Sequence, residues 1–289
     1  MATVFTSFSF SPAAVVVATG PDALTFTQGQ FTQDIRGLEK GAGPSWEHSA
    51  RYGLWLSLKG KLVGDSVIFA RDKDSFLIFS ESLAAAALLE RLNSFLIADE
   101  VDLADETGRW SARWLAPDAL PSDLPPGGYG ARIPGKTDRG LVLFPVETNP
   151  PPVPGAEEEQ AYTRFRYAHG LPRVPGELGE ADLPQEAGLE AYAISFTKGC
   201  YLGQEVMARL HAMGQVRRRL VTVRGEGPVP MRGESVRSGA KTCGELRGAV
   251  ADTEPQTWVG LAMLSRHAFD PVVGAECAGA RLHVSWPTE

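Results

Sequence analysis

Cysteine is scarce in this sequence, and its spacing limits the chemistry that the chain can carry. Only 3 of the 289 residues are cysteines, Cys200, Cys243 and Cys277, and they are too few, too far apart and odd in number to predict a disulfide framework. The chain has no C-x-x-C pair, which argues against a zinc finger or a thioredoxin-like redox pair. This usage fits a reducing compartment, and we predict a cytoplasmic protein.

Long apolar runs and an excess of positive charge are also missing. No Lys or Arg precedes the first apolar run, and that run, Ala13–Ala18, is far too short to span a bilayer, so we expect neither a signal peptide nor a membrane helix. The formal net charge of −7 argues against direct binding to nucleic acid. The run Arg217-Arg218-Arg219 could steer an anion, although a solvated face is the commoner role of such a cluster.

The pattern of apolar residues predicts an α+β protein. Apolar runs separated by charged or glycine-bearing turns predict a β-meander over Leu54–Phe79, and helical spacing follows over Leu83–Leu96. The last third holds short β-rich segments between glycine and proline turns, which is typical of a small antiparallel barrel. We predict a body over residues 1–215, with a subdomain of about 50–115 inserted in it, and a C-terminal β-barrel over 216–289.

The stretch KGCYLGQE, residues 198–205, carries the strongest chemical signal. Cys200 has small, polar and charged neighbours, whereas a cysteine that fills a core usually has apolar ones. We expect a strand over Ala191–Phe196 before it and a helix over Gln204–Met213 after it. The helix N-terminus would then lower the pKa of the thiol, and so would the charge of Lys198 if its side chain points the same way. The alternative is a buried cysteine in a tight turn, with the glycines there for sterics.

Other candidate chemistry is weaker. His169 and His211 could act as a base for the thiol, but neither adjoins Cys200 in sequence. Iron–sulfur clusters usually need four protein ligands, so the chain alone does not predict a metal site, and we expect Cys243 and Cys277 to be packing residues. Upstream, FTQGQFTQDI gathers Gln and Asp side chains, which form either a solvated helix face or the lining of a polar pocket.

These motifs resemble the YgfZ family of folate-binding iron–sulfur assembly and repair factors, which are related to the glycine-cleavage aminomethyltransferase. KGCYLGQE matches the family signature K-G-C-Y-x-G-Q-E. FTQGQFTQDI is similar to the segment F-L-Q-G-Q-x-T-x-D, with Thr27 at the usual leucine, and FRYAHGLP to R-I-x-x-G-I-P. The resemblance runs over most of the chain and implies a ring-like, folate-binding body of two α+β subdomains plus a small C-terminal antiparallel β-barrel.

The resemblance also implies a function and a set of site residues. The function is the assembly or repair of iron–sulfur clusters, supporting enzymes such as those that thiolate tRNA, with no turnover of the usual enzymatic kind. Lys198 and Cys200 would form the reactive site, and Cys200 would contact a cluster without holding it alone. The cofactor would be tetrahydrofolate or a derivative, and the partners iron–sulfur assembly or client proteins. The implied binding residues are Gln30, Thr32, Asp34, Arg166, Tyr201, Gln204, Glu205 and Arg209.

Two alternatives differ in class. A folate-dependent aminomethyl or one-carbon transferase would need carboxylates that this sequence lacks, because Ala84–Ala87 and Ala168 stand where such enzymes carry an aspartate and a glutamate. The other is a non-catalytic module that only binds partner proteins.

Overall fold

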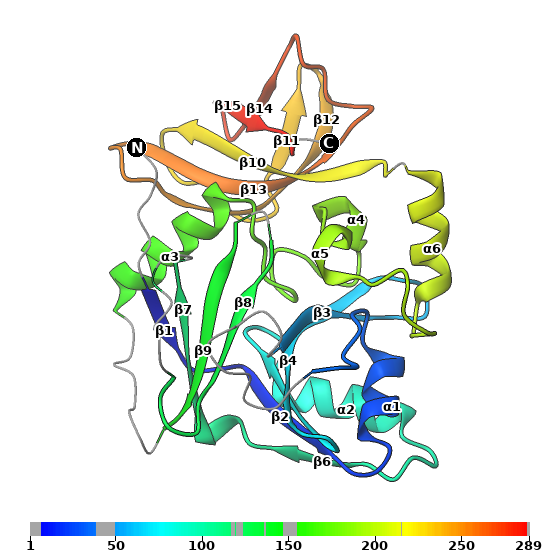
Figure 1. Ribbon diagram of the computed structural model, residues 1–289. Helices are drawn as coiled ribbons and strands as arrows, with labels where there is room; N and C mark the ends of the chain where they lie inside the picture. The colour runs from blue at the N-terminus through cyan, green and yellow to red at the C-terminus, as the bar shows by residue number, and fades with distance from the viewer. Residues whose placement is uncertain are drawn as a thin grey trace.

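The computed structural model describes residues 7–38, 50–116, 119, 124–135, 137–146, 155–214 and 216–287. These residues form a body with two antiparallel sheets and a β-barrel that caps one end of it (Figure 1). The helices α3 (Ala156–Ala168) and α4 (Pro184–Ala187) contact barrel strands, and α6 (Gln204–Met213) leads from the body to the barrel (Figure 1). The predicted α+β class with a C-terminal barrel is therefore confirmed.

The larger sheet confirms the predicted meander. Its strand order is β3-β4-β5-β2-β6, and all neighbours are antiparallel. The helices α1 (Ala23–Gln30) and α2 (Ala85–Phe95) share an apolar core with this sheet, which explains the helical spacing of leucines in α2. The strands are β2 (Ala14–Thr19), β3 (Ala50–Leu56), β4 (Leu62–Asp72), β5 (Ser75–Ser80) and β6 (Asp102–Asp105).

The second sheet has the order β1-β7-β9-β8. Aromatic side chains, among them Phe8, Phe79 and Trp114, form the core that it shares with the larger sheet and α3. Its strands are β1 (Ser7–Phe10), β7 (Trp110–Leu115), β8 (Tyr129–Ile133) and β9 (Arg139–Pro145), and the short helix η1 (Thr107–Arg109) precedes β7. The strands of residues 50–115 thus divide between the two sheets, and the proposed inserted subdomain stays a prediction.

The barrel closes in the order β10-β13-β12-β11-β14-β15. Its core contains Trp258 and both remaining cysteines, Cys243 and Cys277, which are buried free thiols, so their predicted packing role is confirmed. The strands are β10 (Arg218–Glu226), β11 (Ser235–Ser238), β12 (Lys241–Ala251), β13 (Thr257–Ser265), β14 (Ala275–Cys277) and β15 (Ala280–Ser285). Residue 215, at the predicted domain boundary, lies outside the described residues.

Charged side chains join the barrel to the body. Asp182 is fully buried and accepts hydrogen bonds from Arg247 of β12, the shorter at 2.8 Å, while Arg218 of β10 lies 3.5 Å from the same carboxylate. Arg218 also donates two bonds of 2.9 Å to Glu186, and Arg219 donates to the Gln185 carbonyl at 2.6 Å. The arginine run therefore serves as a connection between the two parts, which sequence analysis did not foresee.

Candidate functional site

The FTQGQFTQDI and KGCYLGQE motifs meet in space. The Thr32 hydroxyl donates to the Ala193 carbonyl at 2.7 Å, and the Ser195 amide donates to the Thr32 carbonyl at 3.0 Å. Further along, the Leu202 amide donates to the carbonyl of Gly29 in α1 at 3.0 Å. We call residues 195–203 the Cys200 loop, and the end of α1 is the surface on which this loop rests.

The local structure around the loop differs from the prediction on one side only. A short helix, α5 (Glu190–Ala193), occupies the start of the predicted strand Ala191–Phe196, because backbone groups there bond to Thr32 instead of to a strand. After the loop, α6 begins at Gln204, as predicted. Gly203 before it has a φ of +84° and packs on the Ser57 carbonyl, so that a Cβ at this position would lie 2.7 Å from the Ser57 oxygen.

Lys198 is buried beneath the loop, with only 5% of its surface exposed. Its Nζ donates to the carbonyls of Gln28 and Phe31 at 2.6 Å each and to that of Gln33 at 3.0 Å. Burial lowers the pKa of Lys198 to about 8. The ammonium is therefore hydrogen-bonded to the end of α1, and an effect of its charge on the thiol stays a prediction.

Cys200 itself is an exposed free cysteine. The preceding Gly199 is exposed too, and a Cβ added to it would meet nothing within 4 Å. The alternative of a sealed packing cysteine is therefore wrong. Cys200 does not, however, line any of the three cavities described below.

The other predicted site residues divide into buried and exposed groups. Thr32 is fully buried, and the pKa of Asp34 is well below its usual range because Arg36 hydrogen-bonds its carboxylate. Gln30 and Tyr201 each have a buried polar atom, Oε1 and the hydroxyl, without a hydrogen-bond partner among the described residues. Gln204 is partly buried, whereas Glu205 and Arg209 are exposed on α6.

Arg166 belongs to a different part of the body. It is 2% exposed, and its guanidinium forms two hydrogen bonds with the Glu177 carboxylate, at 3.1 and 3.2 Å. Burial alone would raise the pKa of Glu177, but the charge and hydrogen bonds of Arg166 outweigh it and hold the pKa at about 2. The guanidinium therefore already has a carboxylate partner.

Sequence analysis missed a partly buried polar cluster around Arg166. Tyr52 donates to Asp65 at 2.8 Å, and Arg173 donates to Glu81 at 2.6 Å. Burial raises the pKa of Asp65 to about 7, against the opposing hydrogen bond from Tyr52. These side chains border a cavity of ≈ 20 Å³, about the room of one water molecule. The available signal was Asp65 itself, a lone acid within the apolar strand LVGDSVIFA.

A larger pocket, of ≈ 740 Å³, lies where the body meets the barrel. We call it the junction pocket. It combines aromatic rings with charged groups from α5, β10 and the C-terminal part of the barrel, and Phe269 and Trp286 contact each other with ring centroids 5.2 Å apart. The principal lining residues are Glu190, Tyr192, Arg219, Arg266, Phe269 and Trp286.

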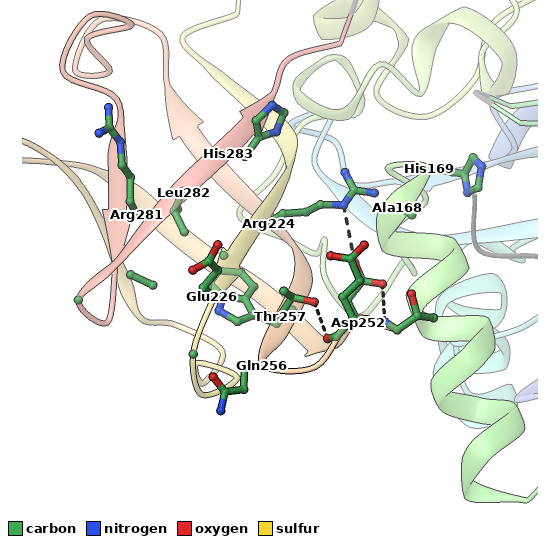
Figure 2. A pocket seen from close by; sticks show the side chains of 17 residues that line it. Ala168, His169, Arg224, Glu226, Asp252, Gln256, Thr257, Arg281, Leu282 and His283 are labelled. Atoms are coloured by element: carbon green, nitrogen blue, oxygen red, sulfur yellow. Dashed lines mark hydrogen bonds and ion pairs between the residues drawn. The ribbon is translucent and has the colours of Figure 1, made fainter. Parts of the chain in front are cut away.

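The barrel carries a third, open groove of ≈ 1430 Å³ beside the end of α3 (Figure 2). Arg224, which lines the groove, pairs with Asp252 at 3.8 Å, and His169 also lines it. His211, the other candidate base, stacks on Phe196 with centroids 3.9 Å apart. No contact of either histidine with Cys200 is found within the described ranges. The part of the chain that the structure describes also holds no cluster of metal-binding side chains and no helix able to cross a membrane.

Comparisons with known proteins agree with this architecture. Residues 217–289 match the family model described as CAF17, C-terminal beta-barrel domain. The chain is 28% identical to the iron-sulfur cluster assembly factor IBA57 of Mus musculus, over 90% of this chain and 77% of that protein. For the Homo sapiens factor of the same name, identity is 29% over 93% of this chain and 82% of that protein.

The names of these relatives correct one prediction. Both are named as mitochondrial proteins, which contradicts the predicted cytoplasmic location. The physical reason is that cysteine usage separates oxidising from reducing compartments but cannot choose among reducing ones.

A solved structure supports the fold of the whole chain. Aminomethyltransferase T of the glycine cleavage system from Bartonella henselae superposes with a TM-score of 0.74 at 15% identity, covering 97% of this chain and 85% of that one. The chain thus has an aminomethyltransferase-like α+β fold, its barrel matches the CAF17 C-terminal domain model, and over most of its length its sequence is similar to the IBA57 proteins.

Proposed function

We propose that this protein is an accessory factor for iron–sulfur cluster assembly or repair, and that Cys200 offers its thiol to a cluster or to the protein that carries one. The observation that carries the proposal is an exposed cysteine on a loop that is fixed at both ends to the body. The similarity to the IBA57 assembly factors supports it. The cluster is cargo in this proposal, because a single thiolate is too few ligands to hold it alone.

The test is complementation of cells that lack their own relative of this protein. We expect Cys200→Ser to fail to restore the activity of an iron–sulfur enzyme under oxidative stress, while the wild type and Thr197→Ala, a change at an exposed residue of the same loop, succeed. Full rescue by Cys200→Ser would rule out a direct role of the thiol. The finer YgfZ-like role predicts that thiolated tRNA falls with the same variant, which mass spectrometry of tRNA would measure.

We further propose that a reduced folate binds in the junction pocket. The volume of the pocket, ≈ 740 Å³, lies within the range of pockets that bind small molecules such as a folate. Tyr192, Phe269 and Trp286 offer faces for a flat pterin, and Arg219 and Arg266 offer partners for the anionic glutamate tail. Gln30, Thr32, Asp34 and Arg166, which the resemblance assigns to folate, do not line this pocket.

Calorimetry with 5-formyltetrahydrofolate tests the folate proposal. Arg266→Gln should weaken binding by roughly 10-fold or more, because a charged hydrogen bond to a carboxylate is lost. Arg281→Gln, an equal change of charge in the barrel groove, should leave binding unchanged. Absence of any binding by the wild-type protein would contradict the proposal and favour a module that binds only proteins.

The one-carbon transferase alternative receives less support. Asp65 and Glu81 are carboxylates of the central cluster, but they are already bonded to Tyr52 and Arg173, and the space beside them holds about one water molecule. A turnover assay with tetrahydrofolate and an aminomethylated carrier would decide this alternative, and we expect no product.

A further inference from the structure

We propose that Lys198 is a positioning residue that fastens the Cys200 loop to the end of α1, and that it does not activate the thiol. The side chain is buried, and its ammonium reaches backbone oxygens of a segment that lies more than 160 positions earlier in the chain. It therefore links the two motifs directly.

The hydrogen-bond count of the ammonium supports this role. A lysine ammonium has three N–H donors and no acceptor. All three are accounted for by the carbonyls of Gln28, Phe31 and Gln33, at 2.6, 2.6 and 3.0 Å. With this geometry no N–H is left to donate to the sulfur of Cys200.

The position of these carbonyls explains why a lysine is needed. Gln28 lies in the last turn of α1, where backbone carbonyls lack partners within the helix, and a positive charge there is favourable. Lys198 therefore completes the end of α1 and ties the loop to it with the same group. No uncharged side chain carries three N–H donors on one atom.

A second anchor lies on the other side of the cysteine. The Leu202 amide donates to the Gly29 carbonyl, so that Cys200 stands two residues from each attachment. Fixing both flanks keeps the thiol in one place while it stays exposed. The inference rests on the proposed function only in treating Cys200 as the reacting group, since the attachment can be measured without any iron–sulfur assay.

The experiment compares Lys198→Met with Lys59→Met, which removes an exposed lysine from the neighbouring hairpin turn. In Lys198→Met we expect the Leu202 amide to exchange with deuterium at least ~10-fold faster than in wild type, since its segment loses one of its attachments to α1. In Lys59→Met exchange should be unchanged. Equal exchange of the Leu202 amide in all three proteins would overturn the proposal.

The second readout separates positioning from activation. The pH profile of Cys200 alkylation by iodoacetamide should give the same apparent thiol pKa in wild type and Lys198→Met. If the lysine charge acted on the thiolate, its removal would raise that pKa by roughly 1 unit or more. Such a rise would overturn the proposal, even if the variant still restores the full activity of iron–sulfur enzymes.

A third measurement applies if Lys198→Met does not fold. Because the pKa of Lys198 is about 8 and a neutral amine keeps only two N–H groups, protection of the Leu202 amide should fall between pH 7 and 9. Cys200→Ser removes the thiol from this titration. The other groups facing the ammonium are Asp34, Arg36 and Tyr201. The pKa of Asp34 is lowered, that of Arg36 is raised, and that of Tyr201 is raised to about 12. Constant protection over this range would contradict the attachment.

Discussion

The hydroxyl of Thr32 and the carbonyl of Ala193 are joined by a hydrogen bond of 2.7 Å, although 161 positions separate them in the chain. The same hydroxyl accepts a bond of 2.8 Å from the Leu54 amide of β3. One side chain therefore connects α5, β3 and the segment after α1, and it does so at a fully buried position.

Replacing Thr32 by Val should lower the free energy of unfolding by about 1–3 kcal/mol, because a buried amide and a buried carbonyl each lose a partner. Thr32→Ser keeps the hydroxyl and should recover most of this loss. Urea denaturation of the three proteins measures the difference. Equal stability of Thr32→Val and wild type would show that the hydrogen bonds of the Thr32 hydroxyl do not hold the segments together.

The three thiols should differ in reactivity. Cys200 is exposed, whereas Cys243 and Cys277 are 2% and 1% exposed, and burial raises the pKa of the Cys277 thiol to about 11. We expect a thiol-reactive dye to label one cysteine in the native protein and three after denaturation. Cys200→Ser should show no fast labelling, and labelling of a barrel cysteine in the native state would contradict the burial.

Asp65 should make stability depend on pH. Its pKa of about 7 in the folded protein exceeds the value of about 3.9 in an unfolded chain, so folding favours the protonated form. This contribution is fully present below pH ~4 and is lost as the pH rises to 7, by roughly 1.4 kcal/mol per pH unit. Asp65→Asn should remove that slope.

Denaturation curves at several pH values between 4 and 8 check this prediction. Asp99→Asn, at an exposed position, is the matched control and should keep the wild-type slope. An unchanged slope in Asp65→Asn would assign the pH dependence to another group.

The attachment of the barrel to the body should depend on Asp182. Asp182→Asn removes the buried carboxylate that Arg247 and Arg218 share and should cost about 3–5 kcal/mol. Arg247 also contacts Glu245, whose side chain is 53% exposed. Glu245→Gln removes this exposed contact and should change the free energy of unfolding by less than about 1 kcal/mol. Calorimetric unfolding of both variants measures this contrast.

Periodic and local signals in the sequence predicted much of the fold. Alternation and turn residues placed β4 and β5, and leucine spacing placed α2. The resemblance placed site residues in both glycine-bearing motifs, but spacing alone could not show that segments 160 positions apart would touch. The α5 helix was mistaken for a strand because four apolar residues in a row fit either state.

The chemical roles of single residues were harder to predict. The sequence suggests that Lys198 is an activating charge, because Cys200 lies only two positions away. In the structure its hydrogen-bond partners are backbone oxygens far away in the chain, and backbone oxygens leave no signature in the sequence. The central cluster of Asp65, Glu81 and Arg166 was missed for the same reason, since each acid or base is paired only by folding.

The exposure of Cys200 has a consequence for selectivity. The thiol lines none of the three cavities described above, so these cavities cannot select a small substrate for it. A protein that reacts at Cys200 must then be recognised through its own surface. Selectivity among clients would depend on that surface as much as on this protein.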